Sequence, residues 1–310
     1  MKFCILFSIL LSIFFLFSCK SINKETINSK KELNYIPYYL KVYEADSLFI
    51  VGNYKQSYNV LDSLFTQYEP LNMSVYSEYE TYIANMVQLN NTQKIRDKIE
   101  KTFSKYGSQI QYFRQDSLLN KALVLSKFSD DEIEKFSKIY QNSLDLELRA
   151  EVEEILEKDQ RYRVGVHKNF DSLGPVDIVN TKKVKFIFEN KGYPGRNKIG
   201  DRSFNGSDVD LTKFFLHTDW GILTEYFLPL ILKYVKSGEC YPPVYATPLD
   251  KVLLYSGEEK QKYGTFYKSS SEIEPVLDLK ALDSLRKSIG LPHINYSAWR
   301  LKAKYGVSFD

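Results

Sequence analysis

The chain has 310 residues, of which 44% are apolar and 26% are charged. This composition supports a folded core and excludes an intrinsically disordered chain. The formal net charge is only +3, whereas nucleic-acid-binding proteins concentrate basic residues on one face, so we expect no nucleic-acid partner.

The first residues predict an export signal followed by a lipid anchor. Lys2 precedes an apolar run over residues 5–17, and residues 16–19 read Leu-Phe-Ser-Cys. The run is shorter than the roughly 20 residues that a membrane-spanning helix needs. The pattern resembles a bacterial lipoprotein signal, which implies that residues 1–18 are removed and that Cys19 is acylated. A plain secretory signal and an uncleaved anchor are the alternatives.

An acylated Cys19 implies that the lipid bilayer is a partner and that the protein resides in the cell envelope. Lys20 follows the cysteine, in place of the Asp that retains lipoproteins at the inner membrane in the best-understood bacteria. We therefore expect the outer membrane, and both the periplasmic and the cell-surface orientation stay open. Residues 19–34 are polar and rich in Lys, Asn and Ser, which is typical of a flexible tether.

Residues 35–142 show helical periodicity and no strand pattern, so we predict a helical arm. The clearest unit spans residues 45–70, where a Gly-Asn-Tyr sequence separates two amphipathic segments. This unit resembles a tetratricopeptide helix pair, and an irregular helical bundle is the alternative. The residues that carry the resemblance are Gly52, Tyr54, Ser57 and Pro70.

From about residue 143 glycines and prolines become frequent, which indicates short elements joined by specific turns. We therefore predict an α-rich domain over residues 143–296 and a C-terminal tail over 297–310. The expected elements are helices over 144–163 and near 178–191, 207–218, 220–237 and 278–289, with a small β-hairpin formed by 252–255 and 263–267. The fold class is mainly α: a helical-repeat-like arm, then a compact α-rich domain with a small β-hairpin.

The helix predicted over residues 144–163 carries polar groups on its apolar face. Apolar side chains recur at helical spacing, and the same face continues through Asp159 and Arg163, with Gln160 at its edge. Ionisable groups on a buried face must be paired or used. Because Asp159 and Arg163 are four residues apart, they can pair with each other. The pattern indicates either an ion pair at the end of the core or a pocket wall with an acid and a fixed cation.

The histidines and cysteines limit which metal-binding, catalytic and disulfide sites the chain can form. The three histidines lack the spacing of a zinc site, so we expect no metal and no cofactor. His217 lies two residues before Asp219, on the flank of an apolar helix face, and is either a structural histidine or a general base in a cleft. Cys240 is the one cysteine left after the signal and the anchor, which excludes an intramolecular disulfide. We expect it to be a small buried residue.

The loop over residues 195–200 has the glycine spacing of a phosphate loop. Asp201 and Arg202 follow it, where such a loop requires Lys and then Ser or Thr. A nucleotide-binding loop is therefore excluded.

Several short motifs follow one another along the second half of the chain. They are Asp159-Gln160-x-x-Arg163, Gly192-Tyr193-Pro194, Gly200, His217-x-Asp219, Tyr245-Ala246, Asp250, Gln261-x-Tyr263-Gly264-Thr265, Asp283-x-x-Arg286 and Gly290-Leu291-Pro292. In order and spacing they resemble the bacterial domain-of-unknown-function family numbered 6624, which is common among lipoproteins and secreted proteins of the Bacteroidetes. The resemblance covers roughly residues 145–296. Leu216, Lys251 and Phe266 depart from the family pattern.

The family brings no established activity, so two hypotheses remain. The first is an interaction module that binds a protein or peptide of the cell envelope, and it rests on the tetratricopeptide-like unit. The alternative is an envelope hydrolase, with a cleft built from Asp159, Arg163, His217 and Tyr263. The candidate site residues are Asp159, Gln160, Arg163, His217, Asp219, Asp250, Gln261 and Tyr263.

Overall fold

The structure is a computed structural model that describes residues 33–163, 170–269 and 272–306. The predicted signal peptide, Cys19 and nearly all of the tether lie outside the described residues. Among the helices that are described, none combines the length and apolarity that a membrane span requires.

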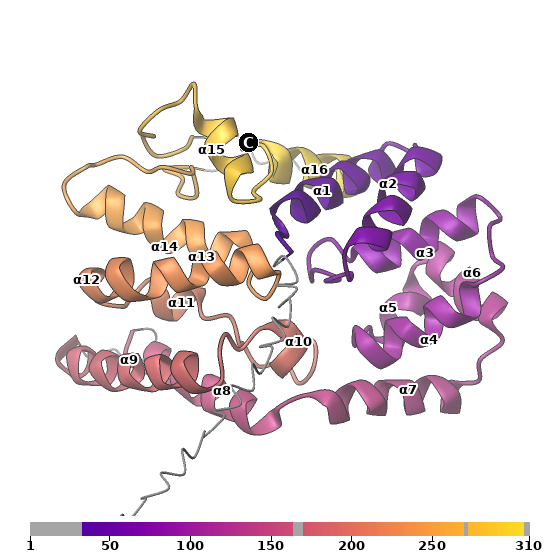
Figure 1. Ribbon diagram of the computed structural model, residues 1–310, viewed down its shortest axis with the longest axis horizontal. Coiled ribbons are helices and arrows are strands. Elements are labelled where there is room, and N and C mark those ends of the chain that lie inside the picture. Colours follow the sequence, from indigo (N-terminus) through magenta and orange to yellow (C-terminus); the bar gives the residue numbers. More distant parts are fainter. Residues whose placement is uncertain (1–32, 164–169, 270–271, 307–310) are drawn as a thin grey trace, which may run out of the picture. The chain divides into compact units, whose positions relative to one another are not determined.

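The described residues are mostly helical, which confirms the mainly α fold class (Figure 1). Turns and loops join the helices, and the only extended pairings in this part of the chain are two isolated bridges. The α-helices are α1 (Ile36–Ile50), α2 (Tyr54–Gln67), α3 (Glu78–Gln88), α4 (Ile95–Lys105), α5 (Ile110–Gln115), α6 (Ser117–Ser126), α7 (Asp130–Ser143), α8 (Leu146–Arg161), α9 (Leu173–Asn190), α10 (Arg196–Ile199), α11 (Thr212–Phe215), α12 (Trp220–Ile222), α13 (Leu228–Ser237), α14 (Pro242–Tyr255), α15 (Leu282–Ser288) and α16 (Tyr296–Tyr305).

The break between α1 and α2 falls where the sequence predicts it. Gly52 adopts a φ of +80°, a conformation that glycine enters without steric penalty. Ser57 on α2 is fully buried, and its hydroxyl donates to the carbonyl of Ala45 on α1 at 2.8 Å. A larger side chain at this position would separate the two helices. The helix pair is thus confirmed, while its relation to tetratricopeptide repeats stays a prediction.

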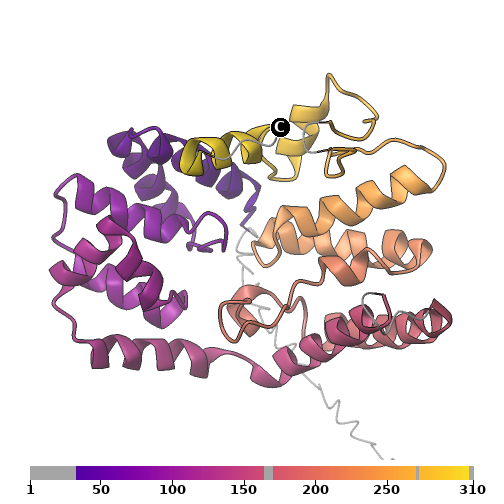
Figure 2. The ribbon, with the colours of Figure 1, turned by 180° about the vertical axis from the view of Figure 1, so that it is seen from behind.

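The two segments predicted as an arm and a domain share one hydrophobic core. Residues Leu33–Asp310 form a single compact unit, and one cluster of buried side chains runs from α1 to α14. The hydroxyl of Tyr39 on α1 donates to the carbonyls of Val235 and Cys240, both at 3.0 Å. Figures 1 and 2 show how α7 and α8 connect the helices of the two segments along one edge. The two segments therefore share the main core, and a smaller cluster of buried side chains lies within the second segment alone.

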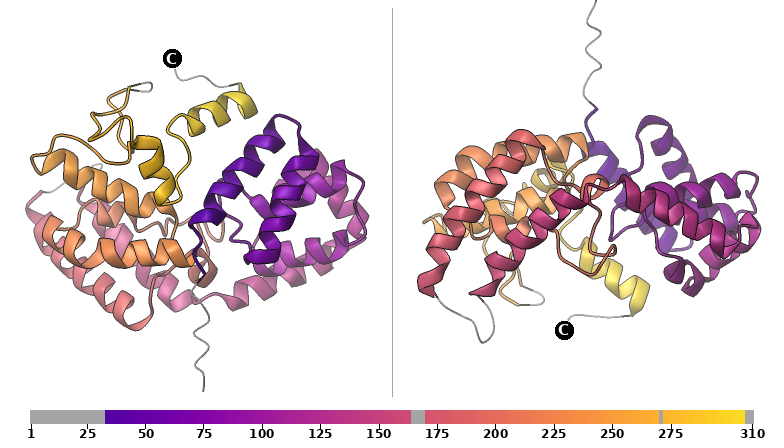
Figure 3. Two further views of the ribbon diagram at one scale, coloured as in Figure 1. Left: turned by 45° about the horizontal axis from the view of Figure 1, so that its top comes forward. Right: turned by 90° about the horizontal axis from the view of Figure 1, so that it is seen from below.

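Most of the described part of the predicted tail over residues 297–310 is helical. Helix α16 packs against α1 (Figure 3). The side chain of Arg300 donates to Asp46 on α1 at 2.7 Å, and both are buried. The hydroxyl of Tyr296 donates to the same carboxylate at 2.5 Å. This pairing spans almost the whole chain and leaves no local signal in the sequence.

The predicted β-hairpin is absent from the described residues. Its first strand, residues 252–255, forms the end of α14 instead. Pro242 begins this helix, where a proline needs no intrahelical partner for its missing N–H. The second strand lies in irregular chain, where only the single bridges Gln261–Val276 and Tyr267–Ile273 form. The helix predicted near 207–218 is likewise reduced to α11.

The apolar segment before Pro229 departs from regular α-helix. A π-helical turn over Leu223–Phe227 joins α12 to α13, with Pro229 in the first turn of α13. Proline has no N–H to donate to the preceding turn. The regular α-helical hydrogen bonds are therefore interrupted at this point, and a wider π-helical turn precedes the proline.

Candidate functional site

The buried stripe of α8 ends in a carboxylate, as the helical periodicity predicts. Leu148, Val152 and Ile155 are fully buried, and Asp159 is only 1% exposed. Nearby, the amide of Asn180 on α9 donates to the carbonyl of Ile155 at 3.1 Å. Asp159 is therefore placed inside the molecule by its own helix.

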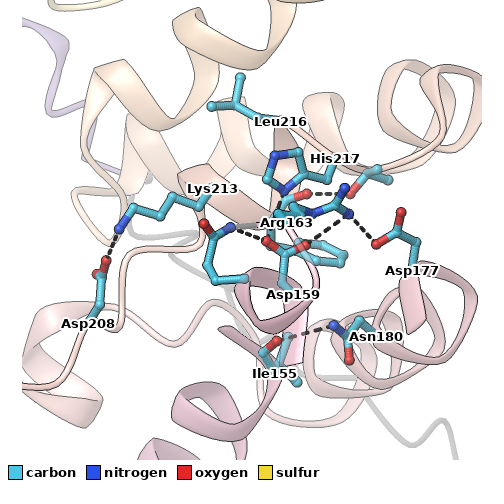
Figure 4. Close-up of polar contacts among 12 residues, drawn as sticks. Ile155, Asp159, Arg163, Asp177, Asn180, Asp208, Lys213, Leu216 and His217 are labelled. Carbon is cyan, nitrogen blue, oxygen red and sulfur yellow. Dashed lines mark hydrogen bonds and ion pairs between the residues drawn. The ribbon is translucent and has the colours of Figure 1, made fainter. Parts of the chain in front are cut away.

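His217 reaches this carboxylate from the turn after α11. Its Nδ1 lies 2.8 Å from Oδ2 of Asp159, and its side chain is 25% exposed (Figure 4). The backbone N–H of His217 and the hydroxyl of Thr218 both donate to the carbonyl of Phe214, at 3.0 Å. These bonds hold the turn, so the imidazole is presented to Asp159 in a defined position. Figure 4 shows the other ring nitrogen of His217 turned away from Asp159.

Two further donors hold the Asp159 carboxylate. The side-chain amide of Gln160 donates to Oδ2 at 2.5 Å, and Nη2 of Arg163 lies 3.5 Å from Oδ1. An ionised carboxylate accepts only, so Nδ1 of His217 must be the donor in their contact. That tautomer leaves Nε2 of His217 with a lone pair directed outward, able to accept a proton.

Arg163 is held by a second carboxylate as well. It pairs closely with Asp177 on α9, and its Nε is enclosed without a hydrogen-bond partner. Two acidic partners offset its charge, so this geometry does not favour Arg163 as a fixed cation that binds an anionic ligand. It orients Asp159 instead and is a positioning residue.

Lys251 on α14 joins the group, although the sequence marks it only as a departure from the family pattern. Its ammonium donates to the carbonyl of Leu216, next to His217. Burial lowers the pKa of Lys251, and the nearby positive charge of Arg163 lowers it further. Asp177 and Lys251 come from helices that no motif links to α8, so no sequence signal identifies them as neighbours.

Three of the remaining candidates, Asp250, Gln261 and Tyr263, form a separate cluster. This fully buried carboxylate of Asp250 accepts the backbone N–H groups of Lys262, Tyr263 and Thr265 at 2.8, 2.9 and 3.0 Å, and the hydroxyl of Thr265 at 2.9 Å. Burial raises the pKa of Asp250, and these bonds oppose that rise. Asp250 thus shapes the loop that follows α14.

Gln261 and Tyr263 belong to the same loop. The amide of Gln261 donates to the carbonyls of Phe266 and Glu274, both at 2.9 Å, and its oxygen accepts the N–H of Phe266. Tyr263 is buried, with its ring 6.1 Å from that of Tyr245. Within the described residues, Tyr263 makes no hydrogen bond to Asp159, Arg163 or His217. Of the four residues proposed for the cleft, Asp159, Arg163 and His217 therefore lie together, and Tyr263 does not.

Asp219 has a local structural role. It is exposed, and its carboxylate accepts the N–H of Ile222 at 3.0 Å, which caps the short helix α12. Asp219 therefore fixes the direction in which the chain leaves His217.

A large pocket lies elsewhere in the molecule. It has a volume of about 1270 Å³ and is lined by both predicted segments, including Tyr43, Tyr76 and Glu80 from the first and Arg196 and Arg286 from the second. Asp159 and His217 are not among its lining residues. The dyad and the pocket are therefore two separate candidate sites.

Metal and thiol chemistry find no support in the described part of the chain. No group of three or more His, Cys, Asp or Glu residues there is arranged to hold a metal ion. Cys240 is buried, and burial raises the pKa of its thiol, which disfavours the reactive thiolate.

Comparisons with protein-family models, with curated proteins and with solved structures find no match for this chain. The geometry described above is therefore the basis for any functional conclusion.

Proposed function

We propose that Asp159 and His217 form the general-base pair of a hydrolytic site in an envelope lipoprotein. One observation carries this proposal: a carboxylate that is 1% exposed holds Nδ1 of a histidine at 2.8 Å, while the histidine side chain remains 25% exposed. A fixed acceptor behind an accessible imidazole is the arrangement that general-base catalysis uses.

The chemistry is hydrolysis with water as the nucleophile. Nε2 of His217 removes a proton from a water molecule as its oxygen forms a bond to the electrophilic carbon or phosphorus of an ester. The bond to the leaving alcohol breaks, and the imidazolium returns its proton to that alcohol. The Asp159 carboxylate stabilises the positive charge on His217 during this step. Such a base contributes on the order of 10²–10⁴ in rate.

Purified soluble protein that begins after the anchor, residues 20–310, tests this proposal against chromogenic carboxylic esters and phosphodiesters. We expect turnover of at least one ester class and its loss in His217→Gln. His293→Gln is the matched control, because His293 is exposed and contacts only the local backbone. Equal activity of the two variants, or no turnover of any ester, would refute the proposal.

A second function, binding of an envelope protein or peptide, is supported by the large pocket. Its lining comes from both segments, as expected of a binding site that depends on the complete chain. Deleting residues 36–142 is not a useful test, because the segments share one core. We expect Thr247→Trp, which places a bulky side chain in the lining, to abolish capture of a partner from envelope extract. Exposed Thr66, outside the lining, serves as the control in Thr66→Trp. Undiminished capture by Thr247→Trp would contradict this second proposal.

The lipid anchor and the outer-membrane location are proposals supported by the signal and the residues that follow it. Mass spectrometry of the mature amino-terminal peptide should find an acylated Cys19. In Cys19→Ser, fractionation should move the protein out of the membrane fraction. An unmodified Cys19 in a membrane-bound protein would rule out this anchor.

A further inference from the structure

Arg286 is a buried cation without an ion-pair partner in the described residues. It lies on α15 and is 7% exposed. Its Nε donates to the carbonyl of Pro292 at 2.7 Å, and its Nη1 to that of Tyr263 at 2.5 Å. The acidic residues close enough to influence it are engaged elsewhere: Asp283 pairs with Lys287 at 2.7 Å, and Asp250 holds the loop after α14.

The backbone carbonyls satisfy only part of the guanidinium. Nη2 of Arg286 has no hydrogen-bond partner among the residues described. This atom is not enclosed by the protein, so a ligand can reach it. A buried charge is costly unless it is paired and fully hydrogen-bonded. Arg286 lines the large pocket, so a ligand bound there can complete its coordination.

Two tyrosines stand near this guanidinium in the same pocket lining. Burial raises the pKa of Tyr43 well above its ordinary value and that of Tyr76 to about 12. The charge of Arg286 opposes this rise at Tyr43, and the charges of Arg300 and then Arg286 oppose it at Tyr76. Both phenols are therefore neutral and can donate. Their rings contact edge to face, with centroids 4.9 Å apart. In the part of the chain that is described, neither hydroxyl has a hydrogen-bond partner, and neither is fully enclosed.

We propose that Arg286, Tyr43 and Tyr76 anchor the oxyanion of an organic ligand, a carboxylate or a phosphate, inside this pocket. An oxyanion accepts several donors at once, and charge-assisted hydrogen bonds are the strong ones. The volume of about 1270 Å³ leaves room for the body of the ligand beyond the anchored group. The inference deepens the second proposed function, because it assigns a ligand chemistry to the same pocket.

Titration calorimetry on the full mature chain at low salt tests the anchor with three probes: benzoate, phenyl phosphate and the neutral benzamide. We expect one or both anions to bind and benzamide to bind at least about tenfold more weakly. This difference corresponds to the loss of charge-assisted hydrogen bonds. The two anions distinguish a carboxylate ligand from a phosphate ligand. Equal binding of benzamide, or no binding of either anion, would overturn the proposal.

Conservative variants separate the anchor from a purely structural role of Arg286. Tyr43→Phe and Tyr76→Phe each remove one hydroxyl and keep the ring, and we expect each to weaken anion binding by about tenfold. Tyr112→Phe is the control, because this tyrosine lines the same pocket from α5 and is 58% exposed. Arg286→Gln should abolish anion binding, but it also removes bonds to the backbone. Unchanged affinity in both tyrosine variants therefore decides against the anchor even if Arg286→Gln unfolds.

The result is independent of the capture experiment. If benzoate or phenyl phosphate binds as expected and no envelope partner is captured, the oxyanion site is supported and the pocket binds a small molecule. If a partner is captured but the anions do not bind, the oxyanion site is refuted and the interaction function is supported.

Discussion

Nδ1 of His217 lies 2.8 Å from Oδ2 of Asp159, although 58 residues separate the two along the chain. The carboxylate is buried in the stripe of α8, while the imidazole comes from the turn between α11 and α12. The contact therefore joins a residue of the core to a residue at the surface. It is this combination, more than either residue, that makes the pair a candidate for proton transfer.

Asp159→Asn tests whether the carboxylate sets the tautomer of His217. An amide can donate to Nδ1, which would move the proton to Nε2 and remove the outward lone pair. We expect a fall in kcat of at least about 100-fold with little change in KM on any ester that the protein hydrolyses. Nitrogen NMR of the imidazole should show the change of tautomer directly. Exposed Glu157 on the same helix provides the control Glu157→Gln, and a similar effect in both variants would remove the assigned role.

Asp250→Asn should damage the fold rather than the chemistry. The carboxylate accepts three backbone N–H groups and one hydroxyl, and an amide cannot accept all four and would place its NH₂ group against donors. We expect a loss of several kcal/mol, of the order reported for a disrupted buried polar network. Urea unfolding measures the loss, and hydrogen exchange at Lys262 and Tyr263 should rise. Normal stability with altered activity would mean that Asp250 acts in catalysis and not in maintaining the fold.

Arg300→Ala tests the link between the two ends of the described chain. Arg300 and Asp46 form a buried pair, and removing one member leaves the other charge without its partner. We expect a loss of about 3–5 kcal/mol in the free energy of unfolding. Lys302→Ala, an exposed substitution on the same helix, should change little. If both variants are equally stable, α16 does not contribute to the folded unit as the structure indicates.

Gly107→Ala should be more damaging than Gly52→Ala, although both glycines have positive φ. The backbone strain of roughly 1–2 kcal/mol is common to both positions. At Gly107 the new Cβ would also overlap the ring of Tyr140 on α7, whereas at Gly52 nothing lies within 4 Å. Overpacking adds about 1–3 kcal/mol. Thermal unfolding of the two variants measures the difference, and equal losses would mean that α7 does not pack on this loop.

Glu69 should make stability depend on pH. Burial raises the pKa of this carboxyl, but the Tyr106 hydroxyl at 2.7 Å and the ammonium groups of Lys101 and Lys105, both at 3.0 Å, more than offset it and lower the pKa to about 2. The folded state therefore favours ionised Glu69, which stabilises the protein above the ordinary pKa of 4.5. This contribution is lost as the pH falls toward 2.

The comparison with Glu69→Gln isolates that effect. The difference in unfolding free energy between wild type and variant should be largest near neutral pH and should shrink below pH 4.5, the ordinary pKa of the carboxyl. Because the side chain is half exposed, we expect a small effect that added salt weakens further. A difference that does not change with pH would show that these contacts are not formed in solution.

Helical periodicity was sufficient to place Asp159 on the buried stripe of α8 and to locate the break at Gly52. Both depend on the spacing of side chains around one helix axis, which is a local property of the sequence. The same local reasoning did not predict that α14 continues through residues 252–255, and it did not reveal that α16 packs on α1 from the other end of the chain.

By itself, the sequence determined the helical character of the chain and which face of α8 carries Asp159. Only the tertiary structure decided that His217 meets Asp159, that Asp250 and Tyr263 lie in a different cluster, and that Arg286 faces a pocket. The reason is physical. Residue spacing sets the direction of a side chain on its own helix, but the packing of distant helices decides what that side chain meets.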